Sequence, residues 1–283
     1  MKSTVSDLEL KAAARTLPPS PQIFGKLSRL LKKPETDVPE ITDLVNTDGS
    51  LAGQVIRISN GTAYNNGDPI ESVEEAINRI GFHELFKMVG VAAASKTFTI
   101  RNVTYGIDGG LLWSNSLATA LAMETLARFS GDDPQEGYTL GLLKSMGKIV
   151  LNLCVRGQYG SPKYDFRGEP PLLEWEEANL GMSNARATSI VLNSWNFPEE
   201  ACQAIEFMYH PDLMPGSNPY CRLLNLSSGI AERVGKKLFG ESSYWKLDQE
   251  YLDELELSQS QIDKATNHVE FQLEQVTTAM TSL

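Results

Sequence analysis

Along much of the chain, apolar residues recur at the three- and four-residue spacing of an amphipathic helix. Within residues 111–129, one such stripe falls at intervals of four, four and three positions: Ala118, Ala122, Leu126 and Phe129. The stretch 190–210 repeats this pattern. Such spacing lets one face of a helix pack against a core. The pattern predicts an all-α fold with about a dozen helices in one compact unit.

Capping residues mark several of the predicted helix starts. Ser72 is followed by Glu75, and Ser258 by Gln261, which is the spacing of a capping box. In that motif a hydroxyl and an acid or amide accept hydrogen bonds from free backbone N–H groups. Asp133 followed by a proline is typical of an N-cap and a first helical position. We therefore expect helices to begin just after residues 72, 133 and 258.

Glycine- and proline-rich stretches predict the connections between helices. They lie at residues 104–110, 156–171 and 210–220. The best strand candidate is 97–107, but it is short and lies between two helical patterns. A helix end followed by a connection is the preferred interpretation of that segment.

Composition and charge limit the kinds of partner and cellular location to be expected for this protein. The 283 residues suit one large domain or two small ones, and the formal net charge of −11 does not favour nucleic acid or an anionic membrane as a partner. No run approaches the ~20 apolar residues of a membrane helix, and the first residues lack the apolar core of a signal peptide. The scattered Cys154, Cys202 and Cys221 argue against a disulfide framework. We expect a cytoplasmic protein with no nucleic-acid binding and no membrane insertion.

Four segments in the first third of the chain carry a family resemblance. They are LPPSP at 17–21, LVNTDGSL at 44–51, VIRISNGTAY at 55–64 and IESVEEAI at 70–77, the last followed by Gly81. Their order resembles the HDOD domain, a helical regulatory module of bacterial signalling proteins related to HD-type metal phosphohydrolases. Within these segments, Asn60 before Gly61 suits a helix end, because both residues tolerate left-handed backbone geometry.

The resemblance extends from about Leu17 to about Gly240 and implies a division of the chain. Residues 1–16 are expected to form an N-terminal helix, and 17–105 the N-terminal helical part of the HDOD domain. Residues 106–240 correspond to a degenerate HD-like part, and 241–283 to a C-terminal helical extension.

The HD-type relatives hold one or two metal ions with a histidine, a His-Asp pair and a later aspartate. The resemblance places other residues at most of these positions in this chain. We call the corresponding set the remnant pocket, and it consists of Asn115 (for the first histidine), Lys144 and Ser145 (for the His-Asp pair), Asn184 (for a further position that is often histidine), Ser228 (for the final aspartate) and the retained His210.

The chemistry of this set argues against a metal site. A divalent ion needs at least three carboxylate, thiolate or imidazole donors, whereas the remnant pocket offers one imidazole. The ammonium of Lys144 would also repel a cation. We therefore expect no metal, no cofactor and no catalytic residues. The segment 141–149 is predicted to be a mostly buried helix. In it, the Lys144 amine must reach solvent or find a carboxylate. If it enters the remnant pocket, it should lie within hydrogen-bonding reach of Asn115, Ser228 or His210, or of a water or anion held there.

Two function hypotheses follow from these observations. The first is a non-catalytic signalling or regulatory protein that binds a protein partner or a small ligand, with the signal and the output supplied by separate molecules. The alternative is a weak phosphohydrolase or nucleotide-binding protein in which Lys144 pairs with a phosphate. The remaining histidines, His83 and His268, are expected to lie on exposed helix surfaces rather than to act as bases. The sequence does not indicate an oligomeric state.

Overall fold

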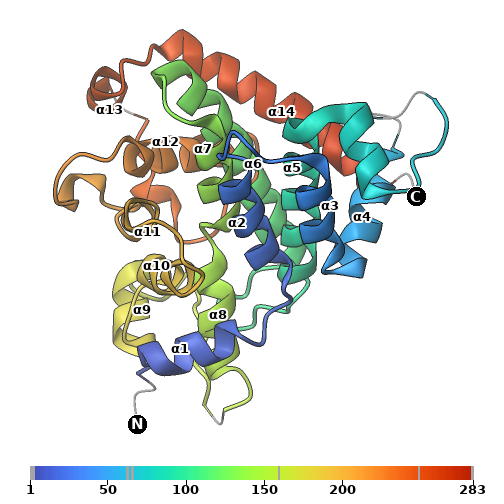
Figure 1. Cartoon of the computed structure of the whole chain (residues 1–283). Helices are drawn as coiled ribbons and strands as arrows, with labels where there is room; N and C mark the ends of the chain where they lie inside the picture. The colour runs from blue at the N-terminus through green and yellow to red at the C-terminus, as the bar shows by residue number, and fades with distance from the viewer. Residues whose placement is uncertain (1–3, 62–63, 65–66, 159, 248, 282–283) are drawn as a thin grey trace. The chain divides into compact units, whose positions relative to one another are not determined.

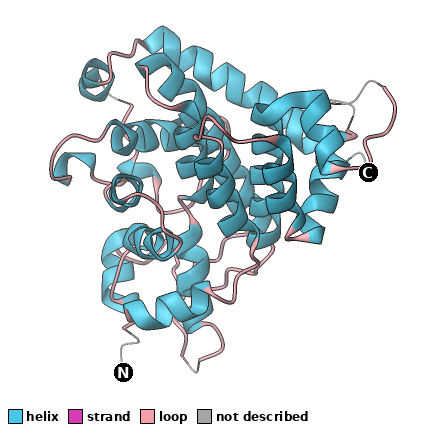
Figure 2. Ribbon diagram, in the orientation of Figure 1, coloured by secondary structure: helices cyan, strands magenta, loops and turns pink. Residues whose placement is uncertain are grey.

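The described residues of the computed structural model form helices and loops, without a strand (Figure 2). The description covers the chain except residues 1–3, 62–63, 65–66, 159, 248 and 282–283. The predicted all-α class is confirmed. No helix within the described part is both long enough and apolar enough to cross a membrane.

The chain folds into two compact units rather than the single unit expected from the sequence. One unit combines residues 1–17 with 98–270, and the other combines residues 18–97 with 271–283. Residues 1–17 and 241–270 thus belong to the same unit as the whole HD-like part. The division at 16, 105 and 240 remains a prediction about family parts, and the two units are described separately below.

Figure 1 labels the helices of both units. The first unit contains α1 (Asp7–Ala14), α6 (Gly109–Ser130), α7 (Pro134–Leu143), α8 (Met146–Val155), α9 (Leu172–Leu180), α10 (Asn184–Ser194), α11 (Glu199–Glu206), η1 (Pro211–Leu213), α12 (Pro219–Arg233), η2 (Ser242–Tyr244), α13 (Gln249–Glu254) and the first half of α14 (Gln259–Thr281). The second contains α2 (Ser20–Leu30), α3 (Val38–Asn46), α4 (Gly49–Ser59), nearly all of α5 (Val73–Phe98) and the end of α14.

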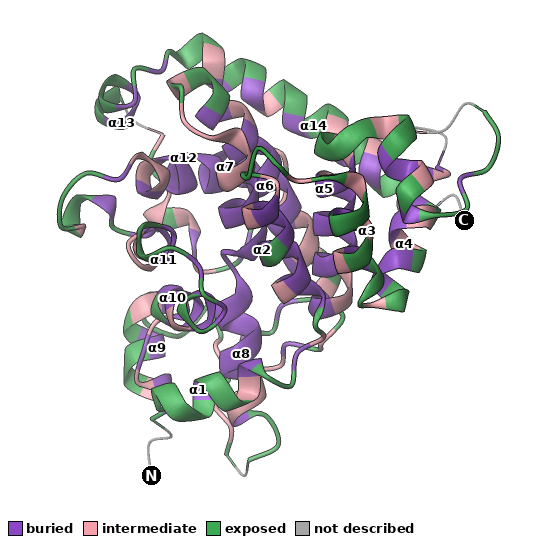
Figure 3. Cartoon of the chain, in the orientation of Figure 1, coloured by how far each residue is buried: buried purple, intermediate pink, exposed green. Residues whose placement is uncertain are grey.

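The core of the first unit is built around α6. This helix packs against α7 and α12, while α10 packs against α8 and α11. Helices α6, α8 and α12 are buried over most of their length, and Figure 3 shows them largely in the colour of buried residues. The buried length of these helices places them inside the core rather than on its surface. Polar side chains on these helices therefore need partners within the protein.

The capping signals in the sequence act as predicted. The N–H of Glu75 donates to Ser72 Oγ at 3.0 Å, although the Glu75 carboxylate accepts from Glu71 N rather than from Ser72 N. The Ser258 and Gln261 box is complete in both directions. Asp133 accepts from the backbone at the start of α7, where a proline occupies the first turn.

The segment 97–107 is a helix end and a connection, as predicted. Helix α5 ends at Phe98, and the following loop contains one isolated antiparallel bridge between Asn102 and Ile107. This loop leads directly into α6, whose N-cap is Asp108.

In the second unit, Asp48 joins three elements. Its Oδ1 caps α4 by accepting from the N–H groups of Ser50 and Leu51, both at 3.1 Å. Its Oδ2 accepts from Ser20 Oγ of α2 at 2.7 Å, and Lys96 Nζ of α5 lies 3.1 Å from Oδ1. One carboxylate therefore fixes α2, α4 and α5 relative to one another.

Asn60 ends α4 as predicted, but not in the left-handed geometry that the sequence suggested. Its φ is −86°, within the right-handed helical region. The side chain explains its role: Nδ2 donates to Ile56 O and Ile70 O, and Oδ1 accepts from Ile70 N at 2.8 Å. The amide thus closes the loop between α4 and α5. Left-handed geometry occurs instead at Gly81, where φ is 82° and α5 is kinked.

The predicted continuous helix over residues 141–149 is wrong. Helix α7 ends at Leu143 and α8 begins at Met146, so Lys144 and Ser145 form the turn between them. A tertiary contact accounts for the break. Gly147 lies so close to α10 that a Cβ built on it would be 2.0 Å from the Asn184 carbonyl oxygen, and its N–H donates to Thr188 Oγ1 at 2.8 Å.

Glycine-to-alanine substitutions at a crowded and at an open position should have opposite effects on stability. Gly147→Ala should destabilise the protein by about 2 kcal/mol or more, because the new methyl group collides with backbone. Gly53→Ala is the matched control, since Gly53 lies in α4 with no atom within 4 Å of its Cβ position. It should stabilise by about 0.5–1 kcal/mol through helix propensity. Urea denaturation measures both, and an unchanged midpoint for Gly147→Ala would contradict the close approach.

Candidate functional site

The six residues of the remnant pocket all belong to the first unit. Asn115 lies on α6, Lys144 and Ser145 form the turn between α7 and α8, Asn184 begins α10, His210 precedes η1, and Ser228 lies on α12. Five of them are buried, and His210 is exposed. The His210 ring packs edge-on against the Tyr244 ring, with 5.5 Å between the ring centres.

Asn115 and Ser228 are not joined to Lys144 by hydrogen bonds. The Asn115 amide donates to Lys236 O at 2.6 Å, while its Oδ1 has no hydrogen-bond partner among the described residues. Ser228 Oγ also has none within the described part of the chain. The expected hydrogen bond from the Lys144 amine to Asn115 or Ser228 is therefore not formed.

The polar centre of this unit is an ion pair between Lys148 and Glu241. Lys148 Nζ lies 2.7 Å from Glu241 Oε1, and both side chains are only 1% exposed. Tyr209 completes a triangle, because its hydroxyl accepts from Lys148 Nζ at 3.1 Å and donates to Glu241 Oε1 at 2.8 Å. Lys148 comes from α8 and Glu241 from the segment just before η2. The pair thus joins two parts of the unit that are distant in sequence.

A second buried carboxylate, Glu176 of α9, is bound to Asn184. The Asn184 side chain donates to Glu176 at 2.9 and 3.1 Å, and its backbone N–H donates to Oε2 at 2.9 Å. The Tyr105 hydroxyl donates to the same carboxylate at 2.7 Å. Asn184 also donates to the Tyr209 hydroxyl at 3.2 Å, which links both carboxylates in one network.

Lys144 enters this network through Glu241. Its Nζ lies 3.7 Å from Glu241 Oε2 and 5.2 Å from the centre of the Trp245 ring. The side chain is 0% exposed, so the amine finds a carboxylate rather than solvent. We call the connected set the buried ion cluster: Lys144, Lys148, Glu176 and Glu241 with Tyr105, Asn184 and Tyr209. Its formal charges cancel when all four charged groups are ionised.

Burial dominates the protonation of these groups. It lowers the pKa of Lys144, despite the opposing effect of Glu241. It raises the pKa of Glu176, which the nearby Lys148 only partly offsets. Burial also acts to raise the pKa of Glu241, but the two lysine ammonium groups overcome it and leave this pKa below its usual value. Glu241 is therefore the carboxylate that stays ionised opposite the lysines.

The remnant pocket does not fit the metal ions of HD-type enzymes. The Asn115 side-chain amide donates to the carbonyl oxygen of Lys236. His210, the one histidine of the remnant pocket, is exposed and is not part of the buried ion cluster. No three histidine, cysteine, aspartate or glutamate side chains of the described residues gather as ligands. A divalent ion beside Lys144 and Lys148 would meet two ammonium groups that already face Glu241, and the other groups of the remnant pocket there are amides and hydroxyls.

Sequence reasoning missed the carboxylates of the cluster. Glu176 carries a usable signal, because it lies four positions after Leu172 and four before Leu180, on the apolar stripe of α9. Glu241 has no such signal, since it follows a glycine in a loop and its partners are distant in sequence. Trp245 and Tyr209 likewise meet Lys144 and Lys148 only through the fold.

Comparison with known proteins identifies relatives of this fold. The family model of the HDOD domain matches residues 17–211. A crystal structure of an HDOD domain protein with unknown function from Geobacter sulfurreducens has a TM-score of 0.62 at 19% identity, with 97% of this chain and 95% of the other covered. A "Putative signal transduction protein" from Marinobacter aquaeolei VT8 has a TM-score of 0.68 at 20% identity, covering 97% and 65%.

A curated relative is longer than this chain. An uncharacterized protein of Treponema pallidum (strain Nichols) is 20% identical over 248 residues, which are 83% of this chain and 45% of the relative. The chain therefore spans less than half the length of that protein.

The ion pair predicts a large and pH-dependent cost for neutralising Glu241. Glu241→Gln should destabilise by about 3–5 kcal/mol near neutral pH, because it leaves two buried ammonium groups without their carboxylate. The loss should shrink as pH rises toward the usual pKa of lysine. The pKa of Lys144 is lowered in the folded protein, so the folded state releases this proton first and gains stability with rising pH.

Glu232→Gln is the matched control for this measurement. Glu232 pairs with Lys237 at 3.2 Å on the surface, with side-chain exposures of 27% and 49%. Its loss should cost less than about 1 kcal/mol and change little with pH. Urea unfolding of both variants between neutral and mildly alkaline pH checks the prediction, which an equal cost in both variants would refute.

Proposed function

Because this chain belongs to the HDOD domain family, we propose that it is a non-catalytic regulatory protein that acts by binding a protein partner or a small ligand. The observation that supports this proposal is the buried ion cluster. Its charged groups are turned toward one another and shielded from solvent, so they are unsuited to bind and activate a substrate. A general acid or base must reach the proton that it transfers.

The cluster also argues against the alternative of a nucleotide-binding protein or weak phosphohydrolase. That hypothesis needs Lys144 to pair with a phosphate, and the Lys144 side chain is 0% exposed beside Glu241. A phosphate would have to displace a carboxylate from inside the core and would bring further negative charge next to Glu241. Repulsion between like charges is strong where water is absent.

The first prediction from the proposed function concerns divalent metals. Mn²⁺, Mg²⁺ and Zn²⁺ should leave the melting temperature unchanged, whereas saturation of a real site at 100 Kd would add ~2.7 kcal/mol of stability. Thermal melts with each ion and with EDTA, metal analysis of the purified protein, and hydrolysis assays on nucleotides and cyclic dinucleotides test this. Stoichiometric metal with turnover would overturn the proposal. A metal-dependent stabilisation that is lost in Asn115→Ala would locate the site at the remnant pocket.

The second prediction concerns restoration of the lost residues. The double variant Lys144→His, Ser145→Asp should show no phosphodiesterase activity, because Asn115 and Ser228 still lack the donor chemistry of a metal site. The same assays with Mn²⁺ present measure this, after urea denaturation has confirmed that the variant folds. Metal-dependent turnover in the double variant would show that more of the enzymatic site survives than the structure indicates.

A further inference from the structure

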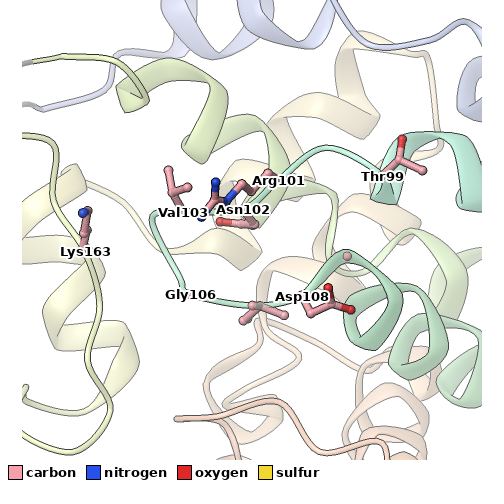
Figure 4. A pocket seen from close by; sticks show the side chains of 9 residues that line it. Thr99, Arg101, Asn102, Val103, Gly106, Asp108 and Lys163 are labelled. Carbon is pink, nitrogen blue, oxygen red and sulfur yellow. The ribbon is translucent and has the colours of Figure 1, made fainter.

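A pocket of about 430 Å³ opens beside the loop that connects α5 to α6 (Figure 4). Residues 99–109 contribute most of its lining, and Lys163 comes from the separate loop between α8 and α9. The volume falls within the range of ~300–1,000 Å³ that is usual for small-molecule sites. The whole pocket belongs to the first compact unit.

Two cations that line the pocket have no side-chain partner among the described residues. Arg101 and Lys163 are both exposed, and neither side chain has an ion pair or hydrogen bond with another described residue. Asp108 is the one acidic residue in the lining, and its Oδ1 accepts from Gly110 N at 2.9 Å and Leu111 N at 3.2 Å. This carboxylate is therefore committed to the start of α6. The lining keeps an excess of one positive charge in a chain whose net charge is −11.

The backbone around Arg101 is held in place by hydrogen bonds to Asn152 of α8. The Asn152 side chain donates to Arg101 O at 3.1 Å and accepts from the N–H groups of Val103 and Thr104 at 3.0 and 3.2 Å. Asn102 adds a bond to Lys148 O at 3.1 Å. A site whose backbone is fixed before binding loses less entropy when a ligand arrives.

The loop that carries Lys163 is attached to the same structure. The N–H of Tyr164 donates to Thr104 O at 2.7 Å, so the two loops are bonded directly next to the pocket. Arg101 and Lys163 thus approach one pocket from two segments that are far apart in sequence, as Figure 4 shows.

We propose that this pocket binds a small molecule through an anionic group, a carboxylate or a phosphate, held by Arg101 and Lys163. The planar guanidinium offers two parallel N–H donors to either anion, and the lysine adds a point charge. Val103 and Ile107 supply apolar lining for the rest of the ligand. This inference rests on the proposed function and names the class of its small ligand.

Three probes that differ mainly in the anionic group test the proposal. Benzoate carries a carboxylate, phenyl phosphate carries a phosphate, and benzamide is the neutral counterpart of benzoate. Each is titrated into ¹⁵N-labelled full-length protein at constant ionic strength, and amide shifts are followed at Gly106 and Gly109. At least one anionic probe should give saturable shifts there, and benzamide should not. The probe that binds more tightly shows whether the anionic group of the ligand is a carboxylate or a phosphate.

Variants localise the binding. Arg101→Gln and Lys163→Gln should each weaken the apparent Kd by about tenfold, because each removes a charged hydrogen bond. Arg156→Gln is the matched control, since Arg156 is an exposed arginine on the same unit and lies outside the lining. It should bind as the parent does. Unchanged urea midpoints confirm that the variants fold, and either pocket variant suffices if the other does not fold.

Several outcomes would overturn the assignment. They are the absence of saturable shifts with both anions, equal binding of benzamide, full affinity in both pocket variants, or an equal loss in Arg156→Gln. Such a result leaves the proposed function intact if metal content and turnover are also absent. Metal-dependent turnover combined with normal anion binding would instead overturn the proposed function and leave the pocket standing.

Discussion

The ion pair between Lys148 and Glu241 is the interaction on which the rest of the first unit depends. Two lysines in the core, Lys144 and Lys148, require buried negative charge, because an uncompensated ammonium out of water is strongly disfavoured. Glu241 meets that need only if the segment after α12 folds back onto α8, which it does. A buried pair of this kind adds little net stability, but it penalises any arrangement that separates the partners. Its main effect here is to select one packing of the segment after α12.

The first unit has paired charges in its core and, among the described residues, two unpaired cations at its surface pocket. Inside the unit, the lysines and carboxylates of the buried ion cluster face one another and are shielded from solvent. At the surface, Arg101 and Lys163 line a pocket without a partner among the described residues. The ligand site proposed for this chain is therefore the pocket lined by Arg101 and Lys163 rather than the buried ion cluster. Arg101 and Lys163 are exposed to solvent, so they are available to bind an anionic ligand.

The features that could be predicted from the sequence are those encoded locally. The helices, their caps at Ser72, Asp133 and Ser258, and the loop after α5 follow from residue spacing within one or two turns, and the structure confirms them. The break at Lys144 could not be predicted, because it results from the approach of Gly147 to α10. Glu241 was missed for a similar reason: no local pattern identifies a charge whose partner is supplied by another helix. The remnant pocket stays a prediction, and the contacts that its residues make depend on this nonlocal packing.

One helix, α8, connects the buried ion cluster to the surface pocket. Lys148 and Asn152 lie four residues apart, so their side chains are one turn apart on the same face. The Lys148 side chain pairs with Glu241, while its carbonyl oxygen and the Asn152 amide hold the loop that carries Arg101. The same loop inserts Tyr105, whose hydroxyl donates to the buried Glu176. Moving this loop would therefore leave a buried carboxylate short of a donor, a cost of roughly 1–3 kcal/mol or more. The loop is thus held in position before any ligand arrives, and a molecule that binds there must fit a preformed site rather than induce one.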